Sequence, residues 1–394
     1  MRLVLTGLLL ATSLTPADNW WISDYGFDQL ALDGTGVTVA VIDTGVDDSH
    51  PDLVGKVVGG VDLSGVGTPD GTTGVGSSSF HGTMVASLIA GQGSDASGVI
   101  GVAPGAELLS VSIGLGVENA DTDQQIASGV IWAVDHGADI INLSLSRNSQ
   151  TWPKSWDEAF GYAFEHDVLI VAAAGNRSDH SGRPSAPATI PGVISVGGVT
   201  KDLQPSQLTA EGFKISVVAP AQDLFGSYPN ETYRSWGGSS AAAPIVSGLL
   251  ALMKQQDPTA TANDLIARLI FSTKDLGDPG IDASFGYGLI DPQAAIAAND
   301  LSAENPLGSL ANWVLLYRPT SPEDTSELVI PENPEPATNN QAEMSTQAEE
   351  IAVVSEQSKS NPGINPLLYW LLVPLAPLLW FALRSGRRVK SRAR

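Results

Sequence analysis

The chain has 394 residues, no cysteine and a formal net charge of −23 at pH 7. So acidic a protein is a poor candidate for a nucleic-acid binder, because phosphate backbones attract positive charge. Without cysteine it forms neither disulfides nor thiolate metal sites, and it has no catalytic thiol. The length allows a large hydrophobic core, and a glycine- and alanine-rich composition with few aromatic residues favours an α/β fold.

The first residues have the layout of a signal peptide. Arg2 supplies a positive charge, an apolar run covers residues 3–14, and small residues lead up to Ala17. About a dozen apolar residues are too few to span a bilayer. We therefore predict a signal peptide at 1–17, cleaved after Ala17. Cleavage at Ser13, or a buried first element of the domain, are the alternatives.

A short apolar, β-branched run at 37–42 is typical of a buried parallel strand. Asp43 follows this run and precedes Thr44 and Gly45. Functional side chains of open α/β sheets gather at such carboxyl ends. Asp-Thr-Gly is also how aspartic proteases present a carboxylate, but those enzymes need two. No second Asp-Thr-Gly or Asp-Ser-Gly occurs in the sequence, which argues against that class.

One of the five histidines, His81, opens a segment whose apolar residues have helical spacing up to Gly91. His81 is therefore predicted as a polar group at the start of a helix. The other histidines are interpreted as surface residues: His50, His136, His166 and His180.

Strand-like and helix-like patterns alternate through the middle of the chain, as a parallel sheet requires. Strands are expected at 108–113, 140–145, 168–173, 193–199 and 215–219, and helices at 124–136 and 156–165. Asn176 closes the run Ala-Ala-Ala-Gly-Asn directly after the strand at 168–173. Taken alone, it is a typical turn asparagine.

Residues 237–244, Gly-Gly-Ser-Ser-Ala-Ala-Ala-Pro, lead into an apolar stretch that ends at Met253. Glycines allow close backbone approach, and proline is tolerated in a first helical turn. Ser240 is thus predicted as an open hydroxyl at a helix start. Such a serine is usually only an N-cap, so a nucleophile hypothesis also requires a base and an orienting carboxylate.

The composition changes after residue 300. Residues 320–360 hold nine acidic residues, one lysine and a cluster of prolines, so they cannot bury a core. We predict an extended, solvated linker at 301–360.

A charge-free stretch follows at 361–383, and six of the last eleven residues are basic. This is a stop-transfer pattern, which predicts a membrane span at 361–383 and a cytoplasmic tail at 384–394. The apolar part at 367–383 is short and contains two prolines, so an interfacial hairpin or a processed sorting tail are alternatives.

Asp43, His81 and Ser240 occur in the order, and within the motifs, of subtilisin-like serine proteases, the subtilases. The chain resembles this family over most of its length. The resemblance implies an α/β, subtilisin-like three-layer fold, mostly a parallel sheet with helices on both faces, at 18–300. Ser239 and Ala241 stand where the family usually has Thr and Met, which affects efficiency more than mechanism.

The resemblance also implies the catalytic roles. Ser240 is the nucleophile, His81 the general base and then acid, and Asp43 orients the histidine. Asn176, with the backbone amide of Ser240, stabilises the oxyanion. The expected activity is endopeptidase cleavage through an acyl-enzyme, with no cofactor required for the chemistry. An inactive subtilase-like surface binding protein is the alternative.

By the same resemblance, the segments that bind the substrate peptide are expected at Gly114, Leu115, Gly116, Ser144, Leu145, Ser146, Ala174 and Gly175. None of these residues is acidic. A pocket for lysine or arginine needs a carboxylate, because a buried unpaired charge is costly. The expected cleavage is therefore after apolar residues.

Three further expectations come from the resemblance. Asp52 lies in a segment whose aspartate often ligates calcium in the family, with the second half of that site at 92–99, so structural calcium and a plain surface loop are both open. The layout leaves no room for the inhibitory propeptide of many secreted members. An exported, membrane-anchored subtilase is similar in architecture to the mycosins, although those usually carry cysteines.

Overall fold

The structure is a computed structural model that describes residues 19–94, 98–178, 182–299, 301–302 and 304–318. These residues belong to the first of two units, which covers residues 1–349, whereas the second covers residues 350–394. The predicted leader, membrane span and tail lie outside the described residues.

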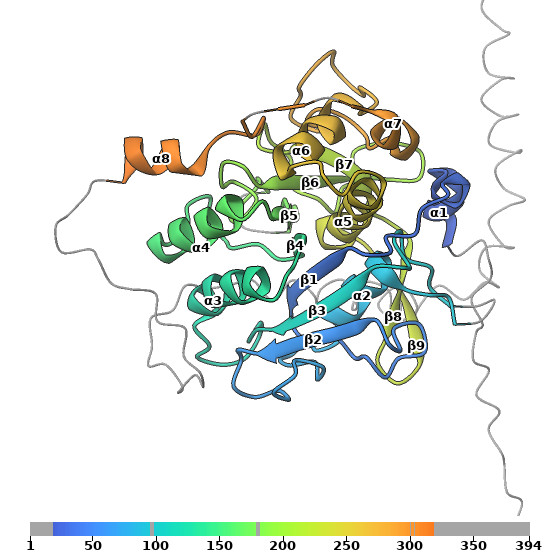
Figure 1. Cartoon of the computed structure of the whole chain (residues 1–394), viewed down its shortest axis with the longest axis vertical. Coiled ribbons are helices and arrows are strands. Elements are labelled where there is room, and N and C mark those ends of the chain that lie inside the picture. Colours follow the sequence, from blue (N-terminus) through green and yellow to red (C-terminus); the bar gives the residue numbers. More distant parts are fainter. Residues whose placement is uncertain (1–18, 95–97, 179–181, 300, 303, 319–394) are drawn as a thin grey trace, which may run out of the picture. The chain divides into compact units, whose positions relative to one another are not determined.

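A seven-stranded sheet with parallel pairing throughout forms the middle layer (Figure 1). Its strand order is β2-β3-β1-β4-β5-β6-β7. The bounds are β1 Thr38–Asp43, β2 Val57–Asp62, β3 Glu107–Ser112, β4 Ile140–Leu143, β5 Leu169–Ala173, β6 Ile194–Val199 and β7 Val217–Pro220. The predicted α/β fold is confirmed.

Helices cover both faces of the sheet. Alternate residues of β1 explain this, because Ala40 and Ile42 pack in one core cluster with α3 and α4, while Val39 and Val41 are buried on the opposite face. That second face carries α2 and α5. The helices are α1 Trp20–Asp24, α2 His81–Ala90, α3 Thr122–Asp135, α4 Lys154–Glu165, α5 Ser239–Gln256, α6 Ala262–Phe271, α7 Pro292–Ala297 and α8 Leu310–Tyr317, with a 3₁₀ turn, η2, at Phe27–Gln29.

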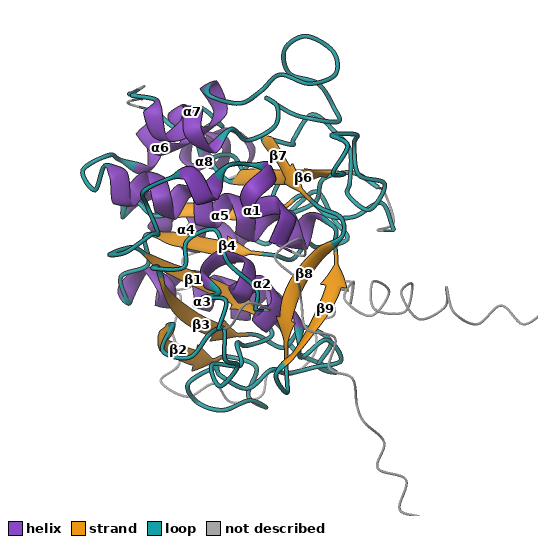
Figure 2. Ribbon diagram, turned by 90° about the vertical axis from the view of Figure 1, so that its right-hand side faces the viewer, coloured by secondary structure: helices purple, strands orange, loops and turns teal. Residues whose placement is uncertain are grey.

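A separate antiparallel hairpin, β8 Leu224–Tyr228 and β9 Thr232–Trp236, lies beside α2 (Figure 2). The sequence did not predict it, nor the partly exposed strand β2. The hairpin immediately precedes α5, so it places the chain that leads to Ser240 next to the helix that begins with His81.

The predicted linker does not begin at 301. Helix α8 lies on α4, and its residue Leu310 is only 3% exposed within the core cluster. The indoles of Trp313 and Trp152 pack with ring centroids 4.5 Å apart. Residues 304–318 are therefore part of the folded unit, because their apolar side chains complete the core over α4. The rest of the predicted linker lies outside the described residues.

Candidate active site

Asp43 and His81 are joined by a hydrogen bond between two elements of the fold. Asp43 is the last residue of β1 and His81 the first of α2. The Nδ1 atom of His81 lies 2.8 and 2.9 Å from the two carboxylate oxygens of Asp43. Donation from Nδ1–H leaves Nε2 as the basic nitrogen of a neutral imidazole. The pair can therefore orient a histidine for proton transfer.

Close backbone approach brings this helix start to the strand end. The backbone N–H of Gly82 donates to Oγ1 of Thr44, at 3.0 Å. A side chain at position 82 would collide with the carbonyl oxygen of Gly45, so only glycine fits there. The Thr-Gly and His-Gly pairs of the sequence thus have one shared structural cause.

Trp236 of β9 packs against the imidazole of His81. The two rings meet edge to face, with centroids 5.6 Å apart and an interplanar angle of 86°. An edge-to-face contact of this kind limits the orientations that a ring can adopt. The sequence analysis did not find Trp236, because its contact depends on a hairpin that was not predicted.

Ser240 is the second residue of α5 and lies beside Ser144, which follows β4. Its hydroxyl donates to the Ser144 carbonyl at 3.0 Å, and the Ser144 hydroxyl donates to the Ser240 carbonyl at 2.9 Å. The preceding Gly238 has φ +95°, which favours glycine. The predicted serine is therefore at a helix start and held against the loop after β4.

The side chain of Asn176 is held by Ser239, the neighbour of Ser240. Its Oδ1 accepts hydrogen bonds from the backbone N–H and the hydroxyl of Ser239, both at 3.2 Å. The Ser239 hydroxyl also lies 2.9 Å from the carbonyl oxygen of Gly175. Engagement of Oδ1 turns the amide nitrogen away from Ser239. The role of Ser239 was missed, although its hydroxyl is what it shares with the Thr usual in subtilases.

The three predicted substrate-binding segments lie at the same end of the sheet, the carboxyl end of its parallel strands, because they follow β3, β4 and β5. Within them, Ser146 and Ala174 are buried, and Leu145 belongs to the core cluster of α3 and α4. Gly114 donates its N–H to Oε1 of Gln125, at 2.7 Å. The Leu145 side chain therefore contributes to the core, and only its backbone remains for peptide pairing. The roles of all three segments in substrate binding stay predictions.

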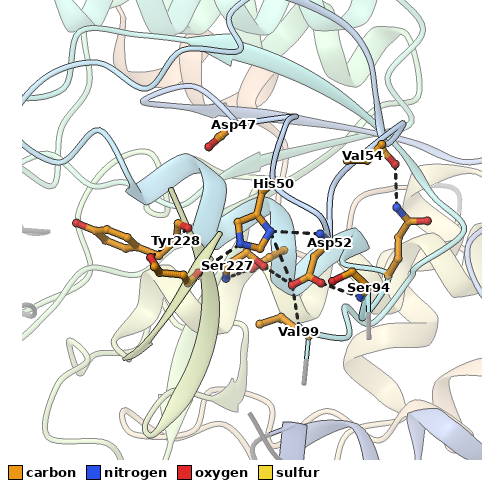
Figure 3. A network of polar contacts seen from close by, with 12 residues as sticks. Asp47, His50, Asp52, Val54, Ser94, Val99, Ser227 and Tyr228 are labelled. Carbon is orange, nitrogen blue, oxygen red and sulfur yellow. Dashed lines mark hydrogen bonds and ion pairs between the residues drawn. The ribbon is translucent and has the colours of Figure 1, made fainter. Parts of the chain in front are cut away.

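The carboxylate of Asp52 is fully buried and is the centre of a polar network (Figure 3). It accepts hydrogen bonds from Ser94 N–H at 2.8 Å, Val99 N–H at 2.9 Å and the Ser227 hydroxyl at 2.7 Å. These partners tie the loop before β3 to the hairpin strand β8. Donors of this kind compete with a cation for the carboxylate.

The described residues contain no cluster of three or more His, Cys, Asp or Glu side chains suited to a metal. Residues 95–97, inside the loop expected to complete a calcium site, lie outside the described part of the chain. Calcium binding at Asp52 stays a prediction.

The interpretation of His50 as a surface residue is wrong. It is 1% exposed, its Nε2 donates to the Thr232 carbonyl at 3.3 Å, and its Nδ1 accepts the Asp52 N–H at 3.2 Å. Its ring also meets that of Tyr233 edge to face. His50 is buried because the hairpin covers it. His136 and His166 are exposed, as predicted, and His180 lies outside the described residues.

A family comparison decides the class of the protein. The family model described as the subtilase family matches residues 34–288. The chain belongs to the subtilase family. It is accordingly a subtilisin-like serine endopeptidase.

Curated relatives agree with this assignment. The subtilase is 36% identical over 265 residues to subtilisin DY of Bacillus licheniformis, which covers 66% of this chain and 91% of that protein. It is 35% identical over 314 residues to fervidolysin of Fervidobacterium pennivorans, covering 70% of this chain. The subtilase spans less than half of fervidolysin, 43% of its length.

Two solved structures are similar in fold. The crystal structure of fervidolysin, a keratinolytic enzyme related to subtilisin, gives a TM-score of 0.63 at 31% identity, covering 72% of this chain and 46% of that one. MycP1 from Mycobacterium smegmatis gives 0.61 at 27% identity, covering 75% and 90%. The similarity to MycP1 is one of fold, and the expected likeness to mycosins in membrane anchoring stays a prediction.

Among the described residues, no helix has the length and apolarity needed to cross a membrane.

Proposed function

We propose that this subtilase cleaves peptide bonds through Ser240, His81 and Asp43. The observation that carries the proposal is the hydrogen-bonded Asp43–His81 pair, because donation from Nδ1–H to Asp43 leaves Nε2 free to act as the base. In the free enzyme the Ser240 hydroxyl donates to the Ser144 carbonyl, so the proposed mechanism requires this hydroxyl to rotate toward Nε2 of His81 when substrate binds. Such tightening on substrate binding is common, since catalytic hydrogen bonds are often loose in the free enzyme.

The reaction proceeds in two halves. Ser240 Oγ attacks the substrate carbonyl carbon while His81 Nε2 takes its proton; the C–N bond then breaks and His81 protonates the leaving amine. Water next attacks the acyl ester, gives one proton to His81, and releases the carboxylic acid as the proton returns to Ser240. Asp43 stabilises the imidazolium in both halves and stays ionised.

Asn176 and the backbone N–H of Ser240 are proposed to bind the oxyanion. The hold of Ser239 on Oδ1 supports this role for Asn176, because it orients the amide nitrogen away from Ser239. The N–H of Ser240 belongs to the first turn of α5, where amides have no helical acceptor and the helix dipole favours negative charge.

The preferred substrate residue before the scissile bond is proposed to be apolar and of medium size. Neither the stretch Leu143–Ser146 nor Ala172–Gly175 contains an acidic residue. Ser146 stands where the family usually has glycine and narrows the pocket. A peptide library should therefore show Leu, Met or Ala before the cleaved bond, whereas dominant cleavage after Arg or Lys would contradict the assignment. Ser240→Ala is the control, and loss of cleavage in that variant would show that the measured cleavage depends on the Ser240 hydroxyl.

We also propose that the enzyme is exported and anchored in the cell membrane through 361–383, with the catalytic domain outside. The charge-free stretch and the basic residues after it support this orientation, because positive residues remain on the cytoplasmic side. The full chain should stay in membranes through an alkaline carbonate wash, and a chain ending at 318 should be released. Release of the full chain would contradict a spanning anchor.

A further inference from the structure

The loop between β4 and α4, residues 144–153, begins with a residue that contacts the proposed nucleophile, Ser240. Its first residue, Ser144, exchanges hydrogen bonds with Ser240. Its next residues include the expected wall of the substrate pocket, and its last residues reach α4. We call this segment the β4–α4 loop. Contacts that fix the end of this loop next to α4 can therefore also affect the positions of the pocket residues at its start.

The middle of the β4–α4 loop is held by Arg147. Its guanidinium pairs with Asp123 of α3 at 3.0 Å and donates to the Thr151 carbonyl at 3.1 Å. It also lies over the ring of Trp156, 5.6 Å from the centroid. Burial raises the pKa of the Asp123 carboxyl and the positive charge of Arg147 opposes that shift. These contacts fix the loop from the side of the domain.

The far end of the loop is closed by the last described residue, Arg318. Its Nη2 donates to the Trp152 carbonyl at 2.9 Å, and its Nε lies 2.7 Å from Oδ2 of Asp157. The indole N–H of Trp152 donates to Oδ1 of the same carboxylate at 2.7 Å. Arg318 also lies over the rings of Trp313 and Trp152, at 5.3 and 5.9 Å. We call these four residues the Arg318 clamp.

The clamp is more than a surface ion pair. The side chain of Asp157 is 7% exposed and that of Arg318 is 27% exposed. Charge-assisted hydrogen bonds at such a partly buried site are stronger than those between fully exposed side chains, which contribute little to stability. The Nη2 atom of Arg318 hydrogen-bonds the Trp152 carbonyl and, at 3.3 Å, Oδ1 of Asp157, while its Nε forms an ion pair with Oδ2. A planar guanidinium can make these contacts and lie over two aromatic rings at once, which the single ammonium of lysine cannot do.

We propose that Arg318 is a positioning residue for the substrate pocket and that helix α8 supports it in this role. They hold the Trp152 end of the β4–α4 loop, so that Ser144 to Ser146 at its other end keep the geometry that productive binding requires. This inference rests on the proposed function. It makes a segment beyond the family match at 34–288 a determinant of specificity.

The test compares Arg318→Met and Arg318→Lys with wild type in the full chain. kcat and KM are measured well below each melting temperature, for peptides that differ only in the residue before the scissile bond. We expect Arg318→Met to lower kcat/KM for the preferred peptide about tenfold and to flatten the preference, because small misplacements at a reacting centre are costly. Arg318→Lys should be intermediate, and it alone is used if the Met variant does not fold.

Arg268→Met is the matched control. Arg268 forms a comparable partly buried pair with Asp257, at 3.0 Å, on α6 rather than on the loop. Its loss should lower stability and leave the peptide preference unchanged. An unchanged preference in both Arg318 variants, or an equal change in the control, would overturn the proposal.

A second readout does not depend on activity. Amide hydrogen exchange over 144–153 should speed up in Arg318→Met and not in Arg268→Met. If wild-type protein cleaves no peptide, the proposed function fails, and exchange alone then decides: faster exchange supports the clamp, and unchanged exchange refutes it.

Discussion

The carbonyl of Ser240 accepts its hydrogen bond from the Ser144 hydroxyl, at 2.9 Å, four residues before a proline. Pro244 lies inside α5 and has no N–H, so it cannot donate the usual helical bond to Ser240. The proline thus leaves a carbonyl available for the loop after β4. A proline inside the helix therefore helps to hold Ser240 against Ser144.

Ser144→Ala should therefore destabilise the fold by about 1–3 kcal/mol, because a buried carbonyl loses its donor. Adding Pro244→Ala should offset part of that loss, since alanine restores an N–H at the right position. Denaturant unfolding of both single variants and the double variant gives the coupling. Strictly additive losses would mean that Pro244 and Ser144 do not share the Ser240 carbonyl.

Asn176→Ala should lower kcat about 10²- to 10³-fold with little change in KM, the range established for the side-chain oxyanion donor of subtilisin. Ser239→Ala should give a smaller loss of kcat, because the amide of Asn176 loses one of its two contacts from Ser239. Ser239→Thr keeps the hydroxyl and should retain activity. A mutant at Asn176 that raised only KM would contradict its assignment to the oxyanion.

The sequence allowed prediction of the sheet and of the site where the signals are local. Buried strands such as β5 are continuous apolar runs, and His81 marks the first residue of α2. The burial of His50 had no local signal. It depends on Thr232 and Tyr233, which lie far along the chain on a hairpin that was not predicted.

Helix α8 is a different case, because its signal was present. Ser309 caps it, accepting from the N–H of Asn312, and Leu310, Trp313 and Val314 have helical apolar spacing. The acidic composition further along the chain favoured a linker over the whole segment. Composition averaged over sixty residues hid a two-turn helix.

Leu310→Ala should cost about 2–5 kcal/mol, the range for a buried leucine. Leu315 on the same helix is 80% exposed, so Leu315→Ala should change the free energy of unfolding by less than about 0.5 kcal/mol. Thermal or denaturant unfolding measures both. Equal, small effects would mean that α8 does not complete the core.

Asp264 is expected to make the stability of the fold depend on pH. Burial alone would raise the pKa of its carboxyl, but hydrogen bonds from Ser302 N–H and from Thr261 outweigh it and lower the pKa. Because the folded pKa is depressed, the contribution is present above the unfolded value of about 3.9 and is lost as pH falls through the folded pKa.

Asp264→Asn should therefore be less stable than wild type at pH 7, and the difference should shrink as the pH falls below about 4. Asp202→Asn, at an exposed aspartate, is the control and should follow the wild-type curve. Unfolding at several pH values provides the measurement. A constant difference between Asp264→Asn and wild type would show that the charge of the Asp264 carboxylate contributes nothing to stability.

Covalent labelling by a fluorophosphonate tests the central claim most directly, because the reagent reacts only with a serine activated by its base. Mass spectrometry of the digested protein should place one adduct on Ser240. Ser240→Ala should take up no label, and His81→Ala should react far more slowly, although both remain folded. Folded wild-type protein that carries no adduct on Ser240 would contradict the account.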